Sequence, residues 1–169
     1  MTESTRAAEP HWEQKLEALL PLYGHRNWIV VADAAYPAQA RPGIETIAAN
    51  EDQIPVVRRV FDAIHSARHV RPTVYIDREL AFVVEDDAPG IVEYRRQLEE
   101  VLYGSHLQRL PHEQIIHKLD QSAQTFRILI IKTEMTIPYT SVFFELDCGY
   151  WSAEAEDRLR QAILAADKK

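Results

Sequence analysis

Two stretches of the chain are apolar almost without interruption, and this pattern restricts the fold more than any other feature of the sequence. Residues 28–32 have the sequence WIVVA, and residues 126–132 have the sequence FRILIIK. A strand with one face in water alternates apolar and polar residues, whereas a strand covered on both faces is continuously apolar. We therefore predict two strands inside a sheet that helices cover on both sides.

The remaining sequence alternates between helix-like and strand-like segments. Apolar residues at helical spacing predict helices over residues 11–22, 53–67, 90–103, 112–124 and 152–167. Shorter apolar runs predict strands over residues 73–76, 80–84, 108–110 and 141–146, and residues 34–43 are predicted to form a loop. This alternation predicts an α/β fold: a three-layer sandwich with a largely parallel sheet and helices on both faces, plus an added C-terminal helix.

The composition narrows the classes of partner and the cellular location. With 169 residues the chain has the size of one domain, and its net charge of −7 argues against a nucleic-acid partner, because phosphate contacts need clustered Lys and Arg. The single Cys148 cannot form an internal disulfide, which favours a reducing compartment. The sequence has no apolar run long enough to span a membrane, and MTESTRAAEP does not resemble a signal peptide. We expect a cytoplasmic protein without a membrane partner.

Several motifs that would assign a chemistry are absent. The sequence has no glycine-rich phosphate loop, no GxSxG elbow, and no HExxH or CxxC spacing. We therefore expect neither a nucleotide cofactor nor a metal site.

Polar residues at the ends of predicted elements are the remaining candidates for chemistry. They are His25 before the first strand, Asp33 after it, His112 at a helix start, and Tyr139 and Ser141 before the last strand. Sites of α/β proteins lie at such ends, above all at the carboxyl ends of strands. Each candidate also has a purely structural interpretation: a helix cap or turn for Asp33, a helix C-terminus for His25, a first-turn histidine for His112, and a turn aromatic for Tyr139.

The spacing of His25 and Asp33 restricts how they can act together. Eight residues separate them, and an extended run of that length spans roughly 25 Å at about 3.3 Å per residue. Two side chains so far apart cannot share one small pocket within one chain. Either the strand is shorter and curled, or a second subunit completes the pocket.

Three of the segments that hold these candidates resemble the motifs of a known family. GHRNWIVVADAAYP (24–37), LPHEQ (110–114) and IPYTSVFFELDCG (137–149) occur in the order and rough spacing of the D-ribose pyranase / L-fucose mutarotase family. The segment GIETIAANEDQIPVVRRVFDAI (43–64) is similar to the part of the family that follows the aspartate. The resemblance covers roughly residues 20–150.

The resemblance implies both an activity and a division of the chain. Members of the family interconvert sugar ring forms as cofactor-free isomerases and assemble into rings, commonly decamers, so the implied partners are a monosaccharide and further copies of the chain, with sites at subunit interfaces. The implied organisation is a flexible tail (1–10), a pyranase/mutarotase-like domain (11–151) and a C-terminal helical extension (152–169).

The resemblance also implies roles for individual residues. His25 takes the place of the catalytic acid/base histidine, and Asp33 that of the substrate-binding aspartate. His112 stands where the ribose branch also has histidine, and Tyr139, Thr140 and Ser141 form the implied substrate-binding segment.

The sequence departs from the family in ways that leave the substrate open. Ser141 stands where the family usually has asparagine, so a shorter hydroxyl replaces an amide that both donates and accepts. The interval from His112 to Tyr139 is about five residues longer than in the ribose branch. The N-terminal helix is extended, and the helix after Trp151 is an addition.

The hypothesis that follows is general acid/base catalysis of ring opening. His25 carries the main proton transfer, since the unperturbed pKa of histidine is about 6.5. Asp33 holds sugar hydroxyls, while His112 and Tyr139 bind the sugar or act as a second proton carrier. Two alternatives stay open: a catalytically inactive sugar-binding or interaction protein on the same scaffold, and an isomerase or hydrolase that acts on another small polar metabolite.

Overall fold

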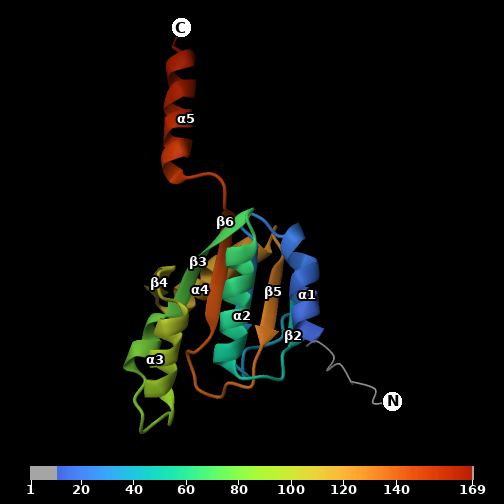
Figure 1. Cartoon of the computed structure of the whole chain (residues 1–169), viewed down its shortest axis with the longest axis vertical. Coiled ribbons are helices and arrows are strands. Elements are labelled where there is room, and N and C mark those ends of the chain that lie inside the picture. Colours follow the sequence, from blue (N-terminus) through green and yellow to red (C-terminus); the bar gives the residue numbers. More distant parts are fainter. Residues whose placement is uncertain (1–10, 169) are drawn as a thin grey trace, which may run out of the picture.

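The computed structural model of the chain describes residues 11–168 and contains a six-stranded sheet and five α-helices (Figure 1). The predicted flexible tail, residues 1–10, lies outside the described residues. The helices are α1 (His11–Leu19), α2 (Gln53–Ser66), α3 (Ile91–Val101), α4 (His112–Ala123) and α5 (Ala153–Ala166), with two short 3₁₀ helices, η1 (Leu20–Leu22) and η2 (Arg78–Phe82). The strands are β1 (Trp28–Ala32), β2 (Ile44–Ala48), β3 (Val70–Asp77), β4 (His106–Leu110), β5 (Ile128–Lys132) and β6 (Val142–Cys148).

The sheet has the strand order β2-β5-β1-β6-β3-β4 and is largely parallel, as predicted. The pairs β1–β5, β2–β5 and β3–β4 are parallel, whereas β6 is antiparallel to both of its neighbours, β1 and β3. The direction of β6 follows from the short link between β5 and β6. A parallel crossover takes a dozen or more residues, so the chain re-enters the sheet at the edge where β5 ended.

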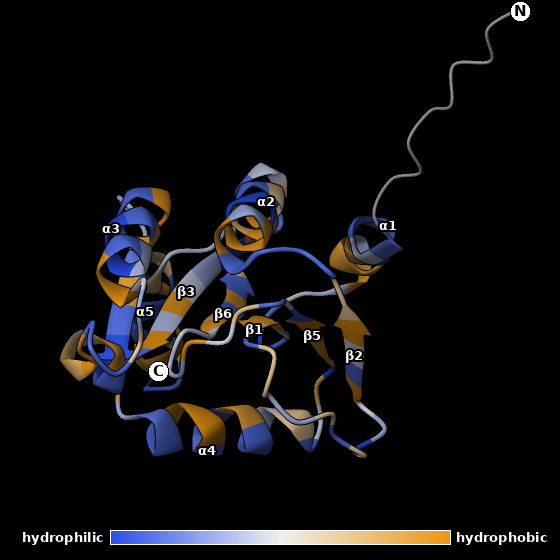
Figure 2. Cartoon of the chain, turned by 90° about the horizontal axis from the view of Figure 1, so that it is seen from below, coloured by the Kyte–Doolittle hydropathy of each residue, from blue (hydrophilic) through white to orange (hydrophobic). Residues whose placement is uncertain are grey.

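Helices cover both faces of the sheet, which confirms the predicted three-layer α/β fold. Figure 2 shows α1, α2 and α3 on one face and α4 on the other. All five residues of β1 are buried, and they alternate between the two layers. Ile29 and Val31 pack in the apolar cluster with α1, α2 and α3, while Trp28 and Val30 pack in the cluster with α4. The continuous apolar run thus reflects cover on both sides.

Two predictions along the chain fail. The edge strand β2 was not predicted, because its sequence IETIA has only one buried residue, Ile44. The strand predicted over residues 80–84 is wrong: this segment lies largely in η2, and Phe82 and Val84 are 71% and 53% exposed. Asp77 lies where β3 and its neighbouring strand β4 both reach the carboxyl end of the sheet, so the apolar residues that follow Asp77 have no strand to pair with.

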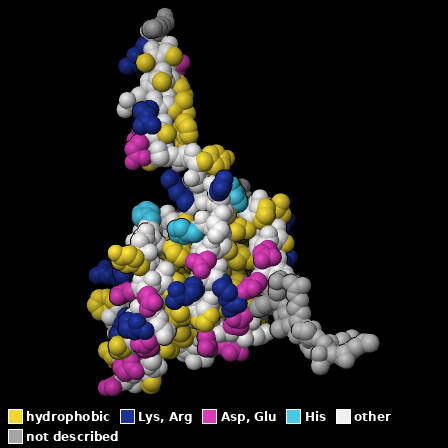
Figure 3. All heavy atoms as spheres, in the orientation of Figure 1, with side chains coloured by type: hydrophobic (Ala, Val, Ile, Leu, Met, Phe, Trp, Pro, Cys, Tyr) yellow, Lys and Arg dark blue, Asp and Glu magenta, His cyan; other side chains and the backbone are white. Residues whose placement is uncertain are grey.

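The predicted C-terminal helix is present as α5, and it projects away from the sheet beyond the end of β6 (Figure 1). None of its residues is buried, and Figure 3 shows apolar side chains exposed along it. Its start is fixed by the Ser152 hydroxyl, which accepts a hydrogen bond from the backbone N–H of Ala155 at 3.0 Å. Just before α5, Gly149 passes so close to the start of β3 that an added Cβ would lie 2.8 Å from the Val70 backbone nitrogen. Within residues 11–168, no helix combines the length and the apolarity needed to cross a membrane.

Candidate functional site

The fold brings most of the polar residues predicted for the site to one edge of the sheet. Asp33 follows β1, Asp77 ends β3, His112 begins α4 directly after β4, and Ser141 precedes β6. The carboxyl ends of the five parallel strands and the amino end of β6 therefore converge, which is where α/β folds place their sites. An open pocket of about 780 Å³, including solvent at its mouth, lies there and is lined by Asp33, Ala35, Tyr36, Pro37, Gln39, Asp77, His112, Ile116, Pro138, Tyr139 and Ser141.

Asp33 is half-buried and is supported by the residue that precedes β6. Its backbone N–H donates a hydrogen bond to the Ser141 hydroxyl at 3.1 Å, and Ser141 is only 3% exposed. Burial raises the pKa of Asp33 above its ordinary value, against the opposing effects of the Tyr36 and Ala35 backbone N–H groups and of nearby His112. The Asp33 carboxylate is thus less well solvated than a surface carboxylate and is ready to accept hydrogen bonds from a ligand.

His112 is paired with a carboxylate that was not among the predicted site residues. Its Nδ1 lies 3.0 Å from each carboxyl oxygen of Asp77, whose side chain is almost completely buried. Burial raises the pKa of Asp77, while the hydrogen bond from His112 works in the opposite direction. An acidic residue at the end of a strand is the same signal that drew attention to Asp33, and it was available in the sequence VYID.

Tyr139 lies beside His112 in a strained backbone conformation. Its φ angle is +60°, which a side chain other than glycine, asparagine or aspartate rarely adopts. The Tyr139 and His112 rings meet edge to face, with centroids 5.8 Å apart and an interplanar angle of 79°. Strain of this kind is often found at functional sites, and here the strained residue lies against the pocket histidine.

Thr140 supports the pocket from behind and does not line it. Its hydroxyl donates to the Ile137 carbonyl at 2.7 Å, and its own carbonyl accepts hydrogen bonds from the Gln53 side chain and the Tyr94 hydroxyl. Because Thr140 is fully buried and its polar groups are already engaged, we assign it to the support of the turn and not to contact with a ligand.

Gln53 ties the strand ends together from inside the molecule. Its side-chain amide donates to the carbonyls of Val31 at 3.1 Å and Thr140 at 2.8 Å, and the Thr133 hydroxyl lies 2.5 Å from its Oε1. This buried network holds the ends of β1 and β5 and the start of β6 in a fixed arrangement. No sequence pattern predicts this network, since a glutamine in the first turn of a helix is ordinarily exposed.

Tyr36 places a buried hydroxyl at the pocket wall. The side chain is 7% exposed, and the hydroxyl makes no hydrogen bond to any of residues 11–168; Gln39 lies near it, outside hydrogen-bond geometry. Burial, with the nearby Asp120 and Asp77 carboxylates, raises the pKa of Tyr36 to about 12. A buried polar group without a partner is costly, so a ligand that bonded to this hydroxyl would remove the cost.

His25 lies at the opposite edge of the sheet and does not line the pocket. Its Nδ1 is 2.7 Å from Asp147 at the end of β6, and Arg71 at the start of β3 also contacts that carboxylate, at 3.2 Å. Partial burial works to raise the pKa of Asp147, but the Cys148 backbone N–H, Arg71 and His25 hold it below its usual value. The regular strand β1 separates His25 from Asp33, so the alternative of a curled strand is wrong.

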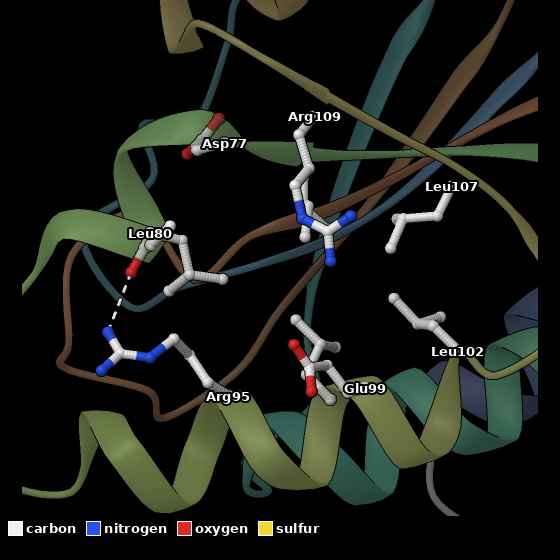
Figure 4. Close-up of a pocket in the computed structure, with 10 residues that line it drawn as sticks. Asp77, Leu80, Arg95, Glu99, Leu102, Leu107 and Arg109 are labelled. Atoms are coloured by element: carbon white, nitrogen blue, oxygen red, sulfur yellow. Dashed lines mark hydrogen bonds between the residues drawn. The ribbon is translucent and has the colours of Figure 1, made fainter.

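A second hollow of about 420 Å³ lies on the other side of Asp77, between α3 and β4 (Figure 4). Figure 4 shows Asp77 at its edge and Leu80, Leu102 and Leu107 around it. Arg95 closes one end by donating to the Leu80 carbonyl at 3.1 Å. Four charged side chains, those of Asp77, Arg95, Glu99 and Arg109, also line this hollow, but it lacks the histidine and the tyrosine that line the pocket beside His112. Among residues 11–168, no group of three or more His, Cys, Asp or Glu side chains is arranged to hold a metal ion.

Comparison with known proteins shows the same architecture. A model of the RbsD / FucU transport protein family matches residues 8–148. The structure of Bacillus subtilis RbsD, complexed with D-ribose, is 20% identical, with a TM-score of 0.54 over 79% of this chain and 91% of that chain. FucU from Bifidobacterium longum is 13% identical, with a TM-score of 0.53 over 79% of this chain and 94% of that chain. The fucose mutarotase of Streptococcus pneumoniae, in complex with L-fucose, is 22% identical, with a TM-score of 0.50 over 79% and 91%. No curated protein matches the sequence.

Proposed function

The chain belongs to the RbsD / FucU transport protein family, and on that premise we propose that it interconverts the ring forms of a monosaccharide without a cofactor. The observation that carries the proposal is the pocket at the carboxyl edge of the sheet, where Asp33, His112, Tyr139 and Ser141 come together. Its size is within the usual range for small-molecule sites. Relatives of the same fold have been solved with D-ribose and with L-fucose.

Ring opening needs two proton transfers, and a different histidine carries out each of them. The anomeric hydroxyl loses a proton, the bond from the anomeric carbon to the ring oxygen breaks, and the ring oxygen gains a proton. Asp33 accepts hydrogen bonds from sugar hydroxyls, and His112 is one proton carrier. His25 is the catalytic acid/base and performs the other transfer. Histidines suit both steps because they gain and lose protons near neutral pH.

The position of His25 requires a second copy of the chain in this proposal. His25 is 57% exposed and lies at the edge of the sheet opposite the pocket, so it can reach only a pocket that belongs to another copy. We propose a homo-oligomer whose sites lie where the amino edge of one sheet meets the carboxyl edge of the next. A cytoplasmic location is part of the proposal and rests on the single cysteine.

The experiment is magnetisation-exchange NMR on D-ribose, L-fucose and a wider panel of monosaccharides. We expect at least one sugar to exchange between ring forms faster with the protein than without it. His25→Ala should remove the acceleration, whereas His117→Ala, which removes an exposed histidine of α4, should keep it. If no sugar in the panel exchanges faster, the proposed activity is wrong.

One observation favours a second candidate, a sugar-binding protein without catalysis. The Ser141 hydroxyl already accepts a hydrogen bond from the Asp33 backbone, so it has less capacity for a sugar than an unengaged amide would have. Calorimetry distinguishes the two: binding of a sugar that the protein does not help to exchange would establish the second candidate.

A further inference from the structure

Asp77 stands out among the pocket residues because the only hydrogen-bonded partner of its carboxyl group within residues 11–168 is the imidazole of His112. Both carboxyl oxygens lie 3.0 Å from His112 Nδ1, and Asp77 is 2% exposed. Burying a carboxylate costs free energy unless the group is paired, so the hydrogen bond between Asp77 and His112 is strongly favoured over any arrangement that breaks it. The imidazole of His112, in contrast, is only partly buried and belongs to the pocket wall.

The carboxylate determines which ring nitrogen of His112 carries the proton. An ionised carboxylate only accepts hydrogen bonds, so Nδ1 must carry a hydrogen and donate it. In the neutral imidazole, Nε2 is then left without a hydrogen and becomes the proton acceptor. A carboxylate that orients a histidine in this way is a common support for reactive imidazoles.

Two further contacts hold the ring in place. The Tyr139 ring packs edge to face against the imidazole and limits its rotation. Glu79, two residues after Asp77, accepts the backbone N–H of His112 with both carboxyl oxygens at 3.1 Å. Pro111 gives α4 no side-chain cap, so Glu79 satisfies this first-turn N–H in its place. The segment from Asp77 to Glu79 thus fixes both the backbone and the side chain of His112.

We propose that Asp77 is a positioning residue, which holds His112 as the Nδ1–H tautomer so that Nε2 exchanges a proton with the anomeric hydroxyl of the sugar. This inference rests on the proposed function and assigns a role that the sequence motifs do not contain. Nε2 takes the anomeric proton as the carbonyl group forms and the electron pair of the broken C–O bond moves to the ring oxygen. That oxygen receives its proton from His25 of a second copy, and ring closure returns both protons.

The first test is a measurement on the unaltered protein. Nitrogen NMR of protein labelled in its histidine rings should show His112 with a protonated Nδ1 and an unprotonated Nε2, assigned by loss of the signals in His112→Gln. A wild-type His112 in the Nε2–H tautomer would overturn the inference. This measurement needs neither catalysis nor a variant of Asp77.

The second test is Asp77→Asn, which keeps the shape of the side chain but supplies an amide that donates to Nδ1. We expect His112 to switch to the Nε2–H tautomer and kcat to fall on the order of 10²- to 10⁴-fold with little change in KM, as for loss of a general base. Glu79→Gln is the matched control, because it alters the contact to the His112 backbone and should leave the tautomer unchanged.

The outcomes separate this inference from the proposed function. If Asp77→Asn switches the tautomer and leaves kcat unchanged, or if it leaves the tautomer as it was, the positioning role is wrong. If the wild-type protein exchanges no sugar, the proposed function fails. In that case the tautomer measurement still decides the role of Asp77. If His112 switches to the Nε2–H tautomer in Asp77→Asn, Asp77 controls the tautomer; if it does not switch, this control is overturned.

Discussion

The two ends of the strands each carry an aspartate–histidine pair, Asp77–His112 at the carboxyl end of β3 and Asp147–His25 at the amino end of β1, but the surroundings of the two pairs differ. At the carboxyl end, Asp77 is buried behind His112, and burial raises the pKa of the carboxyl group. At the amino end, Asp147 and His25 are both substantially exposed, and the pKa of Asp147 is held low. The carboxyl end thus forms a pocket whose histidine is held by a buried carboxylate of the same chain. The amino end instead presents the imidazole of His25, held by Asp147, on the protein surface.

The largest expected effect comes from mixing two inactive variants, one altered at each end. His25→Ala and Asp33→Ala should each lack exchange activity, because each removes one half of the proposed site. Co-assembled in equal amounts, they should recover about a quarter of the wild-type activity, since in a symmetric oligomer a random quarter of the interfaces joins two intact halves. Exchange NMR on the mixture measures this, and a mixture that stays inactive would mean that the two ends do not act together.

The next effect concerns the supports of the two ends. Gln53→Ala should lower the free energy of unfolding by about 2–4 kcal/mol, because it removes the buried amide that donates to the carbonyls of Val31 and Thr140 and accepts from the Thr133 hydroxyl. Arg71→Ala at the amino end removes an exposed ion pair and should cost less than about 1 kcal/mol. Urea unfolding compares the two variants, and equal losses would contradict the contrast drawn between the ends.

Tyr36→Phe should change stability and affinity in opposite directions. Removal of the buried hydroxyl, which has no partner within residues 11–168, should raise the free energy of unfolding by about 1 kcal/mol. The same change should weaken sugar binding, since we expect the hydroxyl to bond to the ligand. Thermal unfolding and calorimetry test the two parts, and an unchanged affinity would remove Tyr36 from the set of binding residues.

A smaller effect should distinguish the two aspartates by pH. The folded pKa of Asp77 is raised, so this carboxyl binds more protons in the folded state and its contribution to stability falls as the pH rises from about 4 through that pKa. The folded pKa of Asp147 is lowered, so its contribution is lost as the pH falls from about 4 through that pKa.

Unfolding free energies measured between acid and neutral pH check this opposite pH dependence of the two contributions. Against wild type, Asp77→Asn should gain stability as the pH rises, and Asp147→Asn should lose it. The Asp147 effect should stay below about 1 kcal/mol, because the group is exposed to solvent. Parallel curves for the two variants would mean that the two carboxyls do not differ in burial as described.

The smallest effect is expected from removal of residues 152–169. No residue of α5 is buried, so deletion should leave the free energy of unfolding of the domain nearly unchanged. This tests the predicted division between domain and extension. Guanidinium unfolding of the shortened chain is the measurement, and a large loss of stability would show that α5 is part of the domain.

The sequence predicted the fold well where burial leaves a periodic pattern. The continuous run at β1 and the helical spacing of α2 and α4 were sufficient to predict the layers and the direction of most strands. The pattern fails at β2, an edge strand with a half-solvated sequence, and at η2, where apolar residues lie on the surface. A hydrophobic pattern predicts an element only where its side chains are buried, and few side chains of these two segments are buried.

Four of the predicted site residues line the pocket, which also contains residues that were not predicted, among them Asp77 and Tyr36. Asp33, His112, Tyr139 and Ser141 were accessible to prediction because they stand at element ends, and those ends meet at one edge of the sheet. Asp77 carries the same signal, whereas the role of Gln53 depends on contacts across 22 and 87 residues of sequence. No local pattern contains such contacts, so only the folded chain reveals them.

The direction of β6 has a consequence for the stoichiometry of ligand binding. This strand begins next to Ser141 in the pocket, and Asp147, its last residue but one, pairs with His25, so the two halves of the proposed site lie at its opposite ends. When halves combine only between copies, an open row of n chains contains n − 1 complete sites, and a closed ring contains n. The number of sugar molecules bound per chain therefore reports whether the assembly has free ends. A value below one would indicate an open row, and a value of one would indicate a closed ring.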